Sequence, residues 1–382
     1  MTQPDFTEHR SMLLDSVTDF ARGVQVARVR KLRETRDECD RKVWAQMAEL
    51  GWLGVLVPEQ YGGMGLKLGD MAIVAQGLAR ALVPEPLTAA AVLAARVLAD
   101  SKNEALKSRL LEGLVSGEIL PAVAWQEQAG TLDAGKIEAQ ATPFEGGFRV
   151  NGSKRFIVGA THADGYIVSA NAKDGMQLLW VPRDAAGADM QFDTLADGRQ
   201  SGTLNLANVS VGKDNVINSG AAAAESLARA IDHTAAIAGA ELCGIMGRSL
   251  EITLEYLKTR VQFGKAIGSF QALQHRAVDL YIQQELSTAV LGDCLSVLDG
   301  VNGSEPNAKT RSAAASRVKA RCTDAALLIT RQAIQMHGAI GFTEDCDVGL
   351  YVKRAMTLAA WLGNGNAHRR RYAKTEILQG AN

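Results

Sequence analysis

The sequence predicts an α+β fold in which a β segment lies between two helical segments. Apolar residues recur at helical spacing up to about residue 120 and again from about residue 220. Between them, short β-like runs are separated by Gly, Asp and Asn. A chain of 382 residues is long enough for two or three domains. We therefore expect a helical domain over 1–120, a central β domain over 121–218 and a helical domain over 219–382.

The N-terminal segment is predicted to be helical in two parts. Over residues 5–50, apolar side chains recur at helical spacing between acids and bases: Met12, Leu13, Val17, Phe20 and Ala21. A second helix over 43–51 should end at Gly51. Residues 52–65 then form a short apolar segment that enters a glycine-rich loop. Helical periodicity returns over 69–120, where Ala and Leu are dense.

The central segment contains four β-like runs, which begin at Phe148, Arg155, Tyr166 and Gln177. Two turn signals separate such runs, one at Glu145-Gly-Gly and one at Asn151-Gly152. Their spacing is that of a small sandwich or barrel. We expect this segment to pack between the helical domains, because no low-complexity linker flanks it.

The C-terminal segment is predicted to contain long helices with two marked interruptions. A strong helix over 250–258 is broken at Gly264 and Gly268 and restarts at Ser269. Residues 302–307 should form a loop between helices. Another helix ends at Gln335-Met-His-Gly-Ala-Ile-Gly-Phe-Thr-Glu344, whose two glycines predict a tight turn. Such a turn admits the close approach of a chain segment or of a flat ligand.

Composition excludes several classes of function. The net charge of −1 gives no reason to expect nucleic acid or an anionic membrane as partner. No run of 18 apolar residues predicts a membrane span, and the N-terminus lacks the pattern of a signal peptide. Five scattered cysteines without a Cys-x-x-Cys pair argue against a disulfide framework or a zinc site. We expect no metal site and a reducing, cytoplasmic setting.

Four motifs together resemble the acyl-CoA dehydrogenase family. They begin at Pro58 (Pro-Glu-Gln-Tyr-Gly-Gly-Met-Gly), Asn151 (Asn-Gly-Ser-Lys-Arg-Phe-Ile-Val), Arg260 (Arg-Val-Gln-Phe-Gly, ending at Phe-Gln271) and Gln335. They occur in the family's order and span nearly the whole chain. The resemblance implies an N-terminal helical domain, a central β domain and a C-terminal four-helix bundle. It also implies bound FAD, a tetramer, an acyl-CoA substrate oxidised between Cα and Cβ, and an electron-transferring flavoprotein as partner.

The resemblance implies cofactor-binding roles for ten residues. Arg260 and Phe263 match positions that hold the pyrophosphate and adenine end of a neighbouring subunit's FAD, and Gln271 matches the glutamine of that signature. A second set matches the segment along the adenosine: Gln335, Gly338 and Ala339. A third set matches the surroundings of the flavin ring: Trp125, Gln126, Phe156 and Val158. An arginine and backbone N–H groups suit a pyrophosphate, and aromatic cover suits the ring.

Bland alternatives stay open for some of these residues. Outside the motif context, Phe156 and Val158 could be an ordinary inward-facing strand pair. Arg260 could be a cation at the end of a helix. The run His368–Arg371 could touch CoA phosphates, although a solvated helix start is the simpler interpretation.

The departures from the family concern the catalytic base. By ungapped matching, Gly363 stands where the family's glutamate is expected. At the alternative glutamate site the chain has Thr234 and Ala235, and Asp232 matches an aspartate usual there. The phosphate-contacting serine becomes Leu132, and Val158 replaces a threonine. We identify no catalytic residue, with Asp232 as a weak candidate.

Two explanations of the missing base are considered. A base could be relocated, with Asp232, His233 and Glu241 as candidates in a homotetramer. Alternatively, the chain could be the base-lacking subunit of a heteromer, as in family members that act on steroid side-chain or dicarboxylic acyl-CoAs. We favour the heteromer, because residues serving a neighbour's flavin persist while those of the chain's own acyl pocket do not. A flavin monooxygenase and a non-catalytic CoA-binding scaffold on the same fold are further alternatives.

Overall fold

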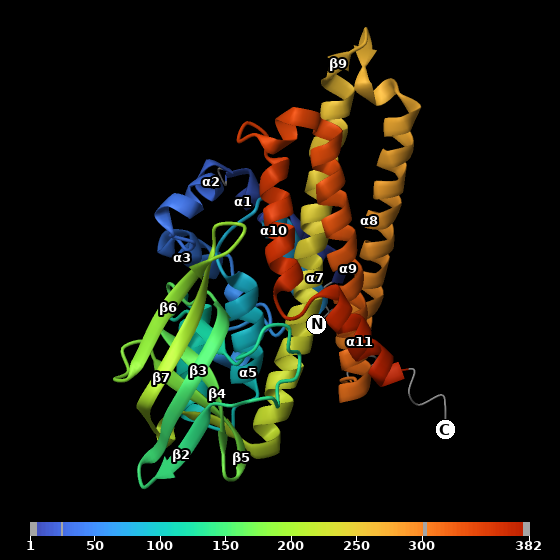
Figure 1. The fold of residues 1–382 in the computed structure, drawn as a ribbon. Helices are drawn as coiled ribbons and strands as arrows, with labels where there is room; N and C mark the ends of the chain where they lie inside the picture. The colour runs from blue at the N-terminus through green and yellow to red at the C-terminus, as the bar shows by residue number, and fades with distance from the viewer. Residues whose placement is uncertain (1–5, 24–25, 301–303, 377–382) are drawn as a thin grey trace. The chain divides into compact units, whose positions relative to one another are not determined.

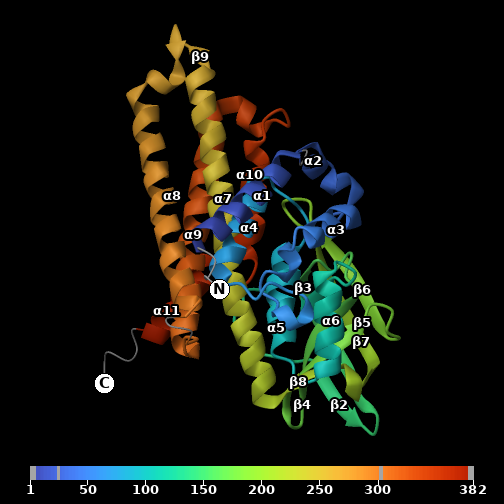
Figure 2. The same ribbon diagram turned by 180° about the vertical axis from the view of Figure 1, so that it is seen from behind.

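A computed structural model describes residues 6–23, 26–300 and 304–376 of the chain. The order of elements is helical, then β, then helical, as the sequence predicts (Figures 1 and 2). Two compact units form: one from residues 1–31, 72–83 and 235–382, and one from 32–71 and 84–234. We call them the helical unit and the β unit. The three-domain division stays a prediction, since the units join segments that are distant in the chain.

The N-terminal third is helical, with its turns where glycine and proline lie. Its α-helices are α1 (Phe6–Gly23), α2 (Val26–Thr35), α3 (Arg41–Glu49), α4 (Leu68–Arg80), α5 (Ala95–Ala99) and α6 (Glu104–Val115). A π-helix over Thr88–Ala94 runs directly into α5. Helix α3 starts at Asp40, whose side chain accepts a hydrogen bond from the Lys42 backbone N (2.8 Å). It is followed by Gly51 at φ 77°, which confirms the predicted helix end.

The β unit contains a mixed, mainly antiparallel sheet. Its strands are β1 (Pro121–Ala124), β2 (Gln140–Phe144), β3 (Gly147–Val158), β4 (Gly165–Ala172), β5 (Gly175–Pro182), β6 (Ala188–Thr194), β7 (Gln200–Gly212) and β8 (Val216–Ser219). The order is β6-β7-β3-β2-β4-β5-β8, with β1 paired in parallel to β4. The strands alternate or bury both faces, and Tyr166, Leu178 and Val150 lie in the core.

One turn prediction in this sheet is right and one is wrong. Glu145-Gly146 does connect β2 and β3 as a hairpin, with Phe144 opposite Gly147. Asn151-Gly152 is not a turn, because it lies inside β3 at a shift of register against β7. Gly152 has φ 145°, and a Cβ there would lie 2.7 Å from the Ala139 Cα. The Asn-Gly pair therefore forms a bulge that the packing of Ala139 requires to contain glycine.

The helical unit is a bundle around α9. Its helices from the C-terminal part of the chain are the second part of α7 (Gly220–Thr259), α8 (Gln271–Leu298), α9 (Ala308–His337), α10 (Val348–Ala360) and α11 (Gly365–Glu376), and α1 and most of α4 also belong to this unit. Figures 1 and 2 show α8 and α9 running alongside each other, and α9 also contacts α10 and α11. Helices α7 and α9 touch at Gly239 and Val318. Between α7 and α8 lies a hairpin that the sequence did not predict, β9 (Val261–Gln262) with β10 (Lys265–Ala266).

The predicted interruption at 302–307 lies partly outside the described residues. Within them, α9 begins after Asn307, whose side chain accepts a hydrogen bond from the Thr310 backbone N (2.9 Å). Among the described residues, no helix has the length and apolar character needed to cross a membrane.

The close approach of α7 to α4 in the helical unit depends on Gly244. A Cβ at this position would lie 2.2 Å from the Gln76 carbonyl oxygen and 3.2 Å from the Ala79 Cβ. We predict that Gly244→Ala lowers the free energy of unfolding by about 1–3 kcal/mol, because the helices must separate. Gly292→Ala is the matched control on α8, where no atom lies within 4 Å. It should gain up to about 1 kcal/mol. Urea unfolding measures both, and equal effects would contradict this account.

Candidate functional site

In the β unit, two predicted flavin-ring segments lie side by side. Trp125 and Gln126 follow β1 directly and are buried, while Phe156 and Val158 end β3 and are half-buried. The backbone N of Arg155 donates a hydrogen bond to the Gln126 carbonyl (2.7 Å). This bond places the segment after β1 against the end of β3, as the shared role predicted for these residues requires.

A buried lysine pins the two segments together. Lys154 is completely buried, and its Nζ donates hydrogen bonds to Glu127 Oε1 (2.5 Å), Ser169 Oγ (3.1 Å) and the Trp125 carbonyl (3.4 Å). The Glu127 carboxylate also accepts hydrogen bonds from the backbone N atoms of Glu138 (2.6 Å) and Ala139 (3.1 Å). Burial opposes charge on Glu127, but the bond from Lys154 and these backbone bonds outweigh it and lower the pKa of Glu127. Burial also lowers the pKa of Lys154.

Phe156 is held in an uncommon backbone conformation. Its φ is +60°, and the register of β3 against β7 shifts between Lys154 and Ile157. A bulge of this kind turns a side chain out of the regular alternation of a strand. The Arg155 guanidinium lies 4.9 Å from the Phe156 ring centroid. The half-buried ring is thus aimed by the bulge, which suits a platform for a flat ligand better than a core strand pair.

The loop after Glu127 uses Gln126 as an anchor. The Gln126 Nε2 donates to the Gln128 carbonyl (3.1 Å) and more weakly to the Thr131 carbonyl (3.5 Å). Gln128 in turn accepts a hydrogen bond from Lys136 Nζ (2.8 Å). The side-chain nitrogen of Gln126 is therefore occupied by its own loop and its carbonyl by Arg155, which leaves the Oε1 atom for a ligand.

In the helical unit, the predicted nucleotide-binding residues lie at the ends of α7 and α9. Arg260 follows α7 and is exposed, as is Gln271 at the start of α8. Phe263 sits at the tip of the hairpin with φ +55° and is 88% exposed. Its ring meets that of Phe270 edge to face at 6.1 Å. An aromatic ring held in the open by a strained tip is suited to contact a partner or a ring of a ligand.

The predicted tight turn after α9 is confirmed. Helix α9 ends at His337, and Gly338 has φ +68° with no atom within 4 Å of where its Cβ would be. Residues 338–342 form a 3₁₀ turn in which Gly338 and Ala339 are exposed. Gln335 is exposed on the last turn of α9. The rings of Tyr256 on α7 and His337 are stacked, with centroids 4.4 Å apart, and this contact joins the two sets of predicted residues.

A third segment, the turn from Trp361 to Asn364, is held by hydrogen bonds from buried side chains. Leu362 and Gly363 both have positive φ, 57° and 90°. Lys319 of α9 is completely buried and donates to the carbonyls of Leu358 (2.7 Å) and Gly363 (3.2 Å). His368 Nε2 donates to the Leu362 carbonyl (2.8 Å). Two carbonyls of the turn, and that of Leu358 near the end of α10, are therefore paired with buried side chains.

The sequence comparisons decide the family. A family model described as the acyl-CoA dehydrogenase N-terminal domain matches residues 7–118, and the C-terminal domain model of the same family matches residues 219–377. This chain belongs to the acyl-CoA dehydrogenase family. The predicted resemblance is thereby confirmed. Acyl-CoA dehydrogenase IpdE2 of Mycobacterium tuberculosis (strain ATCC 25618 / H37Rv) is 31% identical over 357 residues, which cover 93% of this chain and 92% of that protein.

Solved structures confirm the fold class. A variant of the Tcur3481–Tcur3483 steroid acyl-CoA dehydrogenase is 29% identical, covers 98% of both chains and superimposes with a TM-score of 0.84. Similarity of fold alone extends to the ChsE4–ChsE5 complex from Mycobacterium tuberculosis, at 23% identity, TM-score 0.88 and 99% coverage of both chains. It also extends to the FAD complex of PigA, at 22% identity, TM-score 0.89 and 100% coverage of both chains. The family is one of FAD-binding flavoproteins.

The candidates for a relocated acyl-CoA dehydrogenase base are either paired with another side chain or buried on α7. Glu241 accepts a hydrogen bond from Arg354 Nη2 (2.7 Å), and both side chains are buried. The Glu241 carboxylate is therefore already engaged by a buried arginine. Asp232, His233 and Thr234 are buried on α7, where Thr234 Oγ1 donates to the Ala230 carbonyl (2.6 Å).

The expected solvated start of α11 is wrong for His368, which is buried, and right for Arg369 and Arg370, which are exposed. Helix α11 begins at Gly365, and its side chains engage the bundle. His368 is completely buried, and burial, with help from Arg371 and Lys319, lowers its pKa to about 3. Arg369 is ion-paired with Asp324, and Arg371 Nε donates to Ser316 Oγ (2.7 Å). Contacts with α9, far back in the sequence, hold these side chains.

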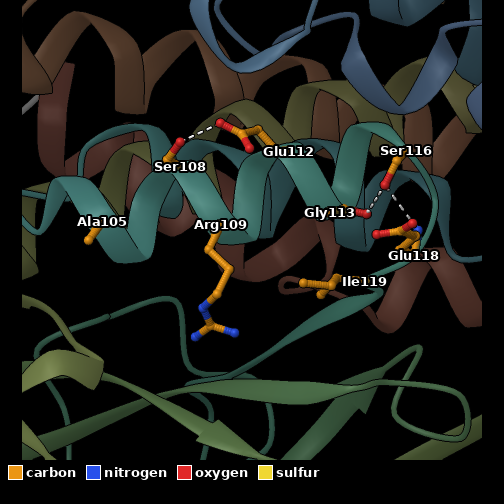
Figure 3. Close-up of a pocket in the computed structure, with 8 residues that line it drawn as sticks. All are labelled: Ala105, Ser108, Arg109, Glu112, Gly113, Ser116, Glu118 and Ile119. Carbon is orange, nitrogen blue, oxygen red and sulfur yellow. Dashed lines mark hydrogen bonds between the residues drawn. The ribbon is translucent and has the colours of Figure 1, made fainter.

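The acyl-CoA dehydrogenase residues discussed above do not line the surface cavity of Figure 3. This cavity of about 630 Å³ lies along α6 in the β unit. Arg109 projects from α6 into it, while Ser108 is bonded to Glu112 on the same helix (Figure 3). Among the described residues we also find no group of three or more His, Cys, Asp or Glu side chains that could hold a metal.

The charge pair under the flavin-ring segments yields a stability prediction. Lys154→Met leaves the nearly buried Glu127 carboxylate without its cation, so we expect a loss of about 3–5 kcal/mol in the free energy of unfolding. The double variant Lys154→Met/Glu127→Gln should recover much of this loss, because no buried charge remains. Denaturant unfolding followed by tryptophan fluorescence measures both. A double variant no more stable than the single variant would show that the unpaired Glu127 charge is not what destabilises Lys154→Met.

Lys319 yields a prediction on pH. Burial lowers its pKa from the usual range to about 7, so between about pH 7 and 10 the unfolded chain binds more protons than the native chain. Native stability therefore rises with pH in this window, and it loses that gain as the pH falls to about 7. Relative to Lys319→Met, we expect wild type to gain up to about 1.4 kcal/mol per pH unit there. The measurement is urea unfolding of both proteins at each pH. A stability difference between them that stays the same between about pH 7 and 10 would show that Lys319 does not titrate in this way.

Proposed function

We propose that this chain is the base-lacking subunit of an FAD-dependent acyl-CoA dehydrogenase that forms an α,β-double bond in an acyl-CoA thioester. The observation that carries the proposal is the turn at Leu362-Gly363. Its backbone is held by buried side chains as firmly as a catalytic turn requires, yet Gly363 offers no carboxylate. Since Glu241 is committed to Arg354, the α-proton of the substrate is taken by a carboxylate of a second, homologous subunit.

FAD suits the residues that this chain presents. Exposed Arg260 provides a fork of donors for a pyrophosphate, and Phe263 provides an open ring for adenine. The open backbone at Gly338 and Ala339, with Gln335, suits the adenosine. In the β unit, Trp125, Gln126, Phe156 and Val158 suit the flavin ring. When bound, FAD supplies the hydride acceptor for the hydrogen that leaves Cβ.

Exposed apolar side chains of the helical unit support a multi-subunit assembly. Four of them lie at helical spacing along one face of α8: Val278, Tyr281, Ile282 and Leu286. Phe342, in the turn after α9, is 81% exposed. A contiguous exposed apolar stripe of this kind is typical of an interface, which supports contact with another subunit. A tetramer containing this chain and a base-carrying relative fits the asymmetry between its intact nucleotide residues and its missing glutamate.

The similarity to a steroid acyl-CoA dehydrogenase supports a bulky, steroid-derived acyl group as the substrate. An electron-transferring flavoprotein then reoxidises the flavin. All five cysteines are free thiols, and four of them are buried, which supports a reducing, cytoplasmic setting.

Anaerobic titration with a steroid acyl-CoA tests the proposal. The chain purified alone should leave the flavin absorbance unchanged on the timescale in which the mixed complex bleaches it, because a general base supplies about 10²–10⁴-fold. The partner to use is a homologous subunit with an intact glutamate. Glu241→Gln in the chain alone is the matched control for a relocated base.

The outcomes separate the alternatives. Rapid bleaching by the chain alone that Glu241→Gln abolishes would establish a self-sufficient homomer and reject the partner proposal. Protein that retains no FAD, alone or mixed, would indicate a scaffold. Turnover that requires oxygen and no electron-transferring flavoprotein would indicate a monooxygenase.

A further inference from the structure

A ring stack lies between the two segments that, in the proposed function, face one FAD molecule. The rings of Tyr256 and His337 are 4.4 Å apart between centroids and 20° from parallel. Tyr256 precedes Arg260 by one helical turn, and the Arg260 backbone N donates to the Tyr256 carbonyl (2.8 Å). His337 is the last residue of α9 and directly precedes Gly338. Each ring of the stack therefore belongs to a residue that lies next to one of the two segments: Tyr256 is one turn before Arg260, and His337 directly precedes the 338–342 turn.

His337 is fixed on its other sides as well. Its Nδ1–H donates to the Ala333 carbonyl (2.8 Å), and the side chain is 5% exposed. The turn packs back onto it, because a Cβ at Gly341 would lie 3.1 Å from the His337 Cβ and 2.8 Å from the Ile334 carbonyl oxygen. Burial lowers the pKa of His337, so the ring that stacks is neutral near neutral pH. The imidazole thus has one orientation, and Tyr256 meets it face to face.

The position of the stack distinguishes it from ordinary core packing. Its neighbours Thr259, Arg260, Gly338 and Ala339 are all exposed, and Tyr256 itself is only half-buried. Removing either ring would therefore free two surface segments that the stack now joins.

We propose that Tyr256 and His337 are positioning residues for FAD. Their stack fixes the separation between Arg260–Phe263 and Gln335–Ala339, so that both segments meet the same nucleotide. This inference rests on the proposed function, since it takes FAD as the ligand. Two segments held at the right spacing before binding lose little freedom when the cofactor arrives, whereas two independent segments must both be ordered by it.

A double-mutant cycle on FAD affinity tests the proposal. The wild-type chain and the variants His337→Ala, Tyr256→Ala and the double variant are stripped of flavin and titrated with FAD, and Kd is read from the quenching of flavin fluorescence. We expect each single variant to raise Kd about tenfold. The double variant should also raise it about tenfold rather than a hundredfold, because both changes remove the same contact. His337→Phe and Tyr256→Phe retain a stack and should stay within about threefold of wild type.

Hydrogen exchange gives a second readout that does not need FAD. In the flavin-free protein, His337→Ala should speed exchange in 338–342 and also in 260–270, a segment that contains no mutated residue. Leu328→Ala is the matched control, because this partly exposed side chain lies on α9 away from the stack. It should change neither segment.

The results divide cleanly. Wild type that binds FAD with the same affinity as His337→Ala, or exchange that changes only in 338–342, overturns the positioning role while the proposed function stands. Fully additive losses in the double variant overturn it too. Wild type that binds no FAD overturns the proposed function and this inference with it, and in that case the exchange result alone reports whether the stack couples the segments.

Discussion

The helical unit depends on one constraint, which is that side chains of helix α9 must support backbone turns at two places along its length, one by hydrogen bonds and one by packing. Lys319 donates to the carbonyl of Leu358 in α10 and to that of Gly363 in the 361–364 turn, and His337 packs against the 338–342 turn at the end of α9. Eighteen residues of helix separate them, which is about 27 Å at 1.5 Å per residue. Because one continuous helix joins the two residues, α9 sets the distance between them. The 338–342 turn and the 361–364 turn are therefore both supported by side chains of the same helix.

The same physical device recurs in the β unit. Lys154 and Lys319 are both completely buried, and each donates to backbone carbonyls of a segment that carries predicted site residues. Burying an ammonium group is costly, so such a residue persists where geometry repays the cost. Lys154 offsets it with the Glu127 carboxylate at 2.5 Å. Among the residues that the structure describes, no carboxylate lies within hydrogen-bonding distance of Lys319, and burial lowers its pKa to about 7.

The sequence predicted those parts of the site that depend on local backbone rules. The tight turn at Gly338 follows from glycine after a helix, and the order of helical and β segments follows from periodicity. It could not predict features that depend on distant partners. Gly152 is a bulge rather than a turn because Ala139 packs against it. His368 is buried rather than solvated because both ring nitrogens find partners: Nε2 donates to the Leu362 carbonyl, and Nδ1 pairs with the Ser316 hydroxyl. Tyr256 carries no motif, and only its contact with His337 marks it out.

The backbone at Gly363 gives a physical reason why a glutamate, the residue that we propose is missing there, would not fit this turn. At φ 90° this residue lies in the region that only glycine occupies without strain, and Leu362 before it is already at φ 57°. A glutamate at 363 would add a second strained residue, at a cost of order 1–3 kcal/mol. The carbonyl bonds from Lys319 and His368 hold the turn in that conformation, so the chain cannot relax to accept the side chain without giving them up. The turn is therefore committed to a form without a carboxylate, which fits the proposed role of a subunit whose chemistry is completed by another.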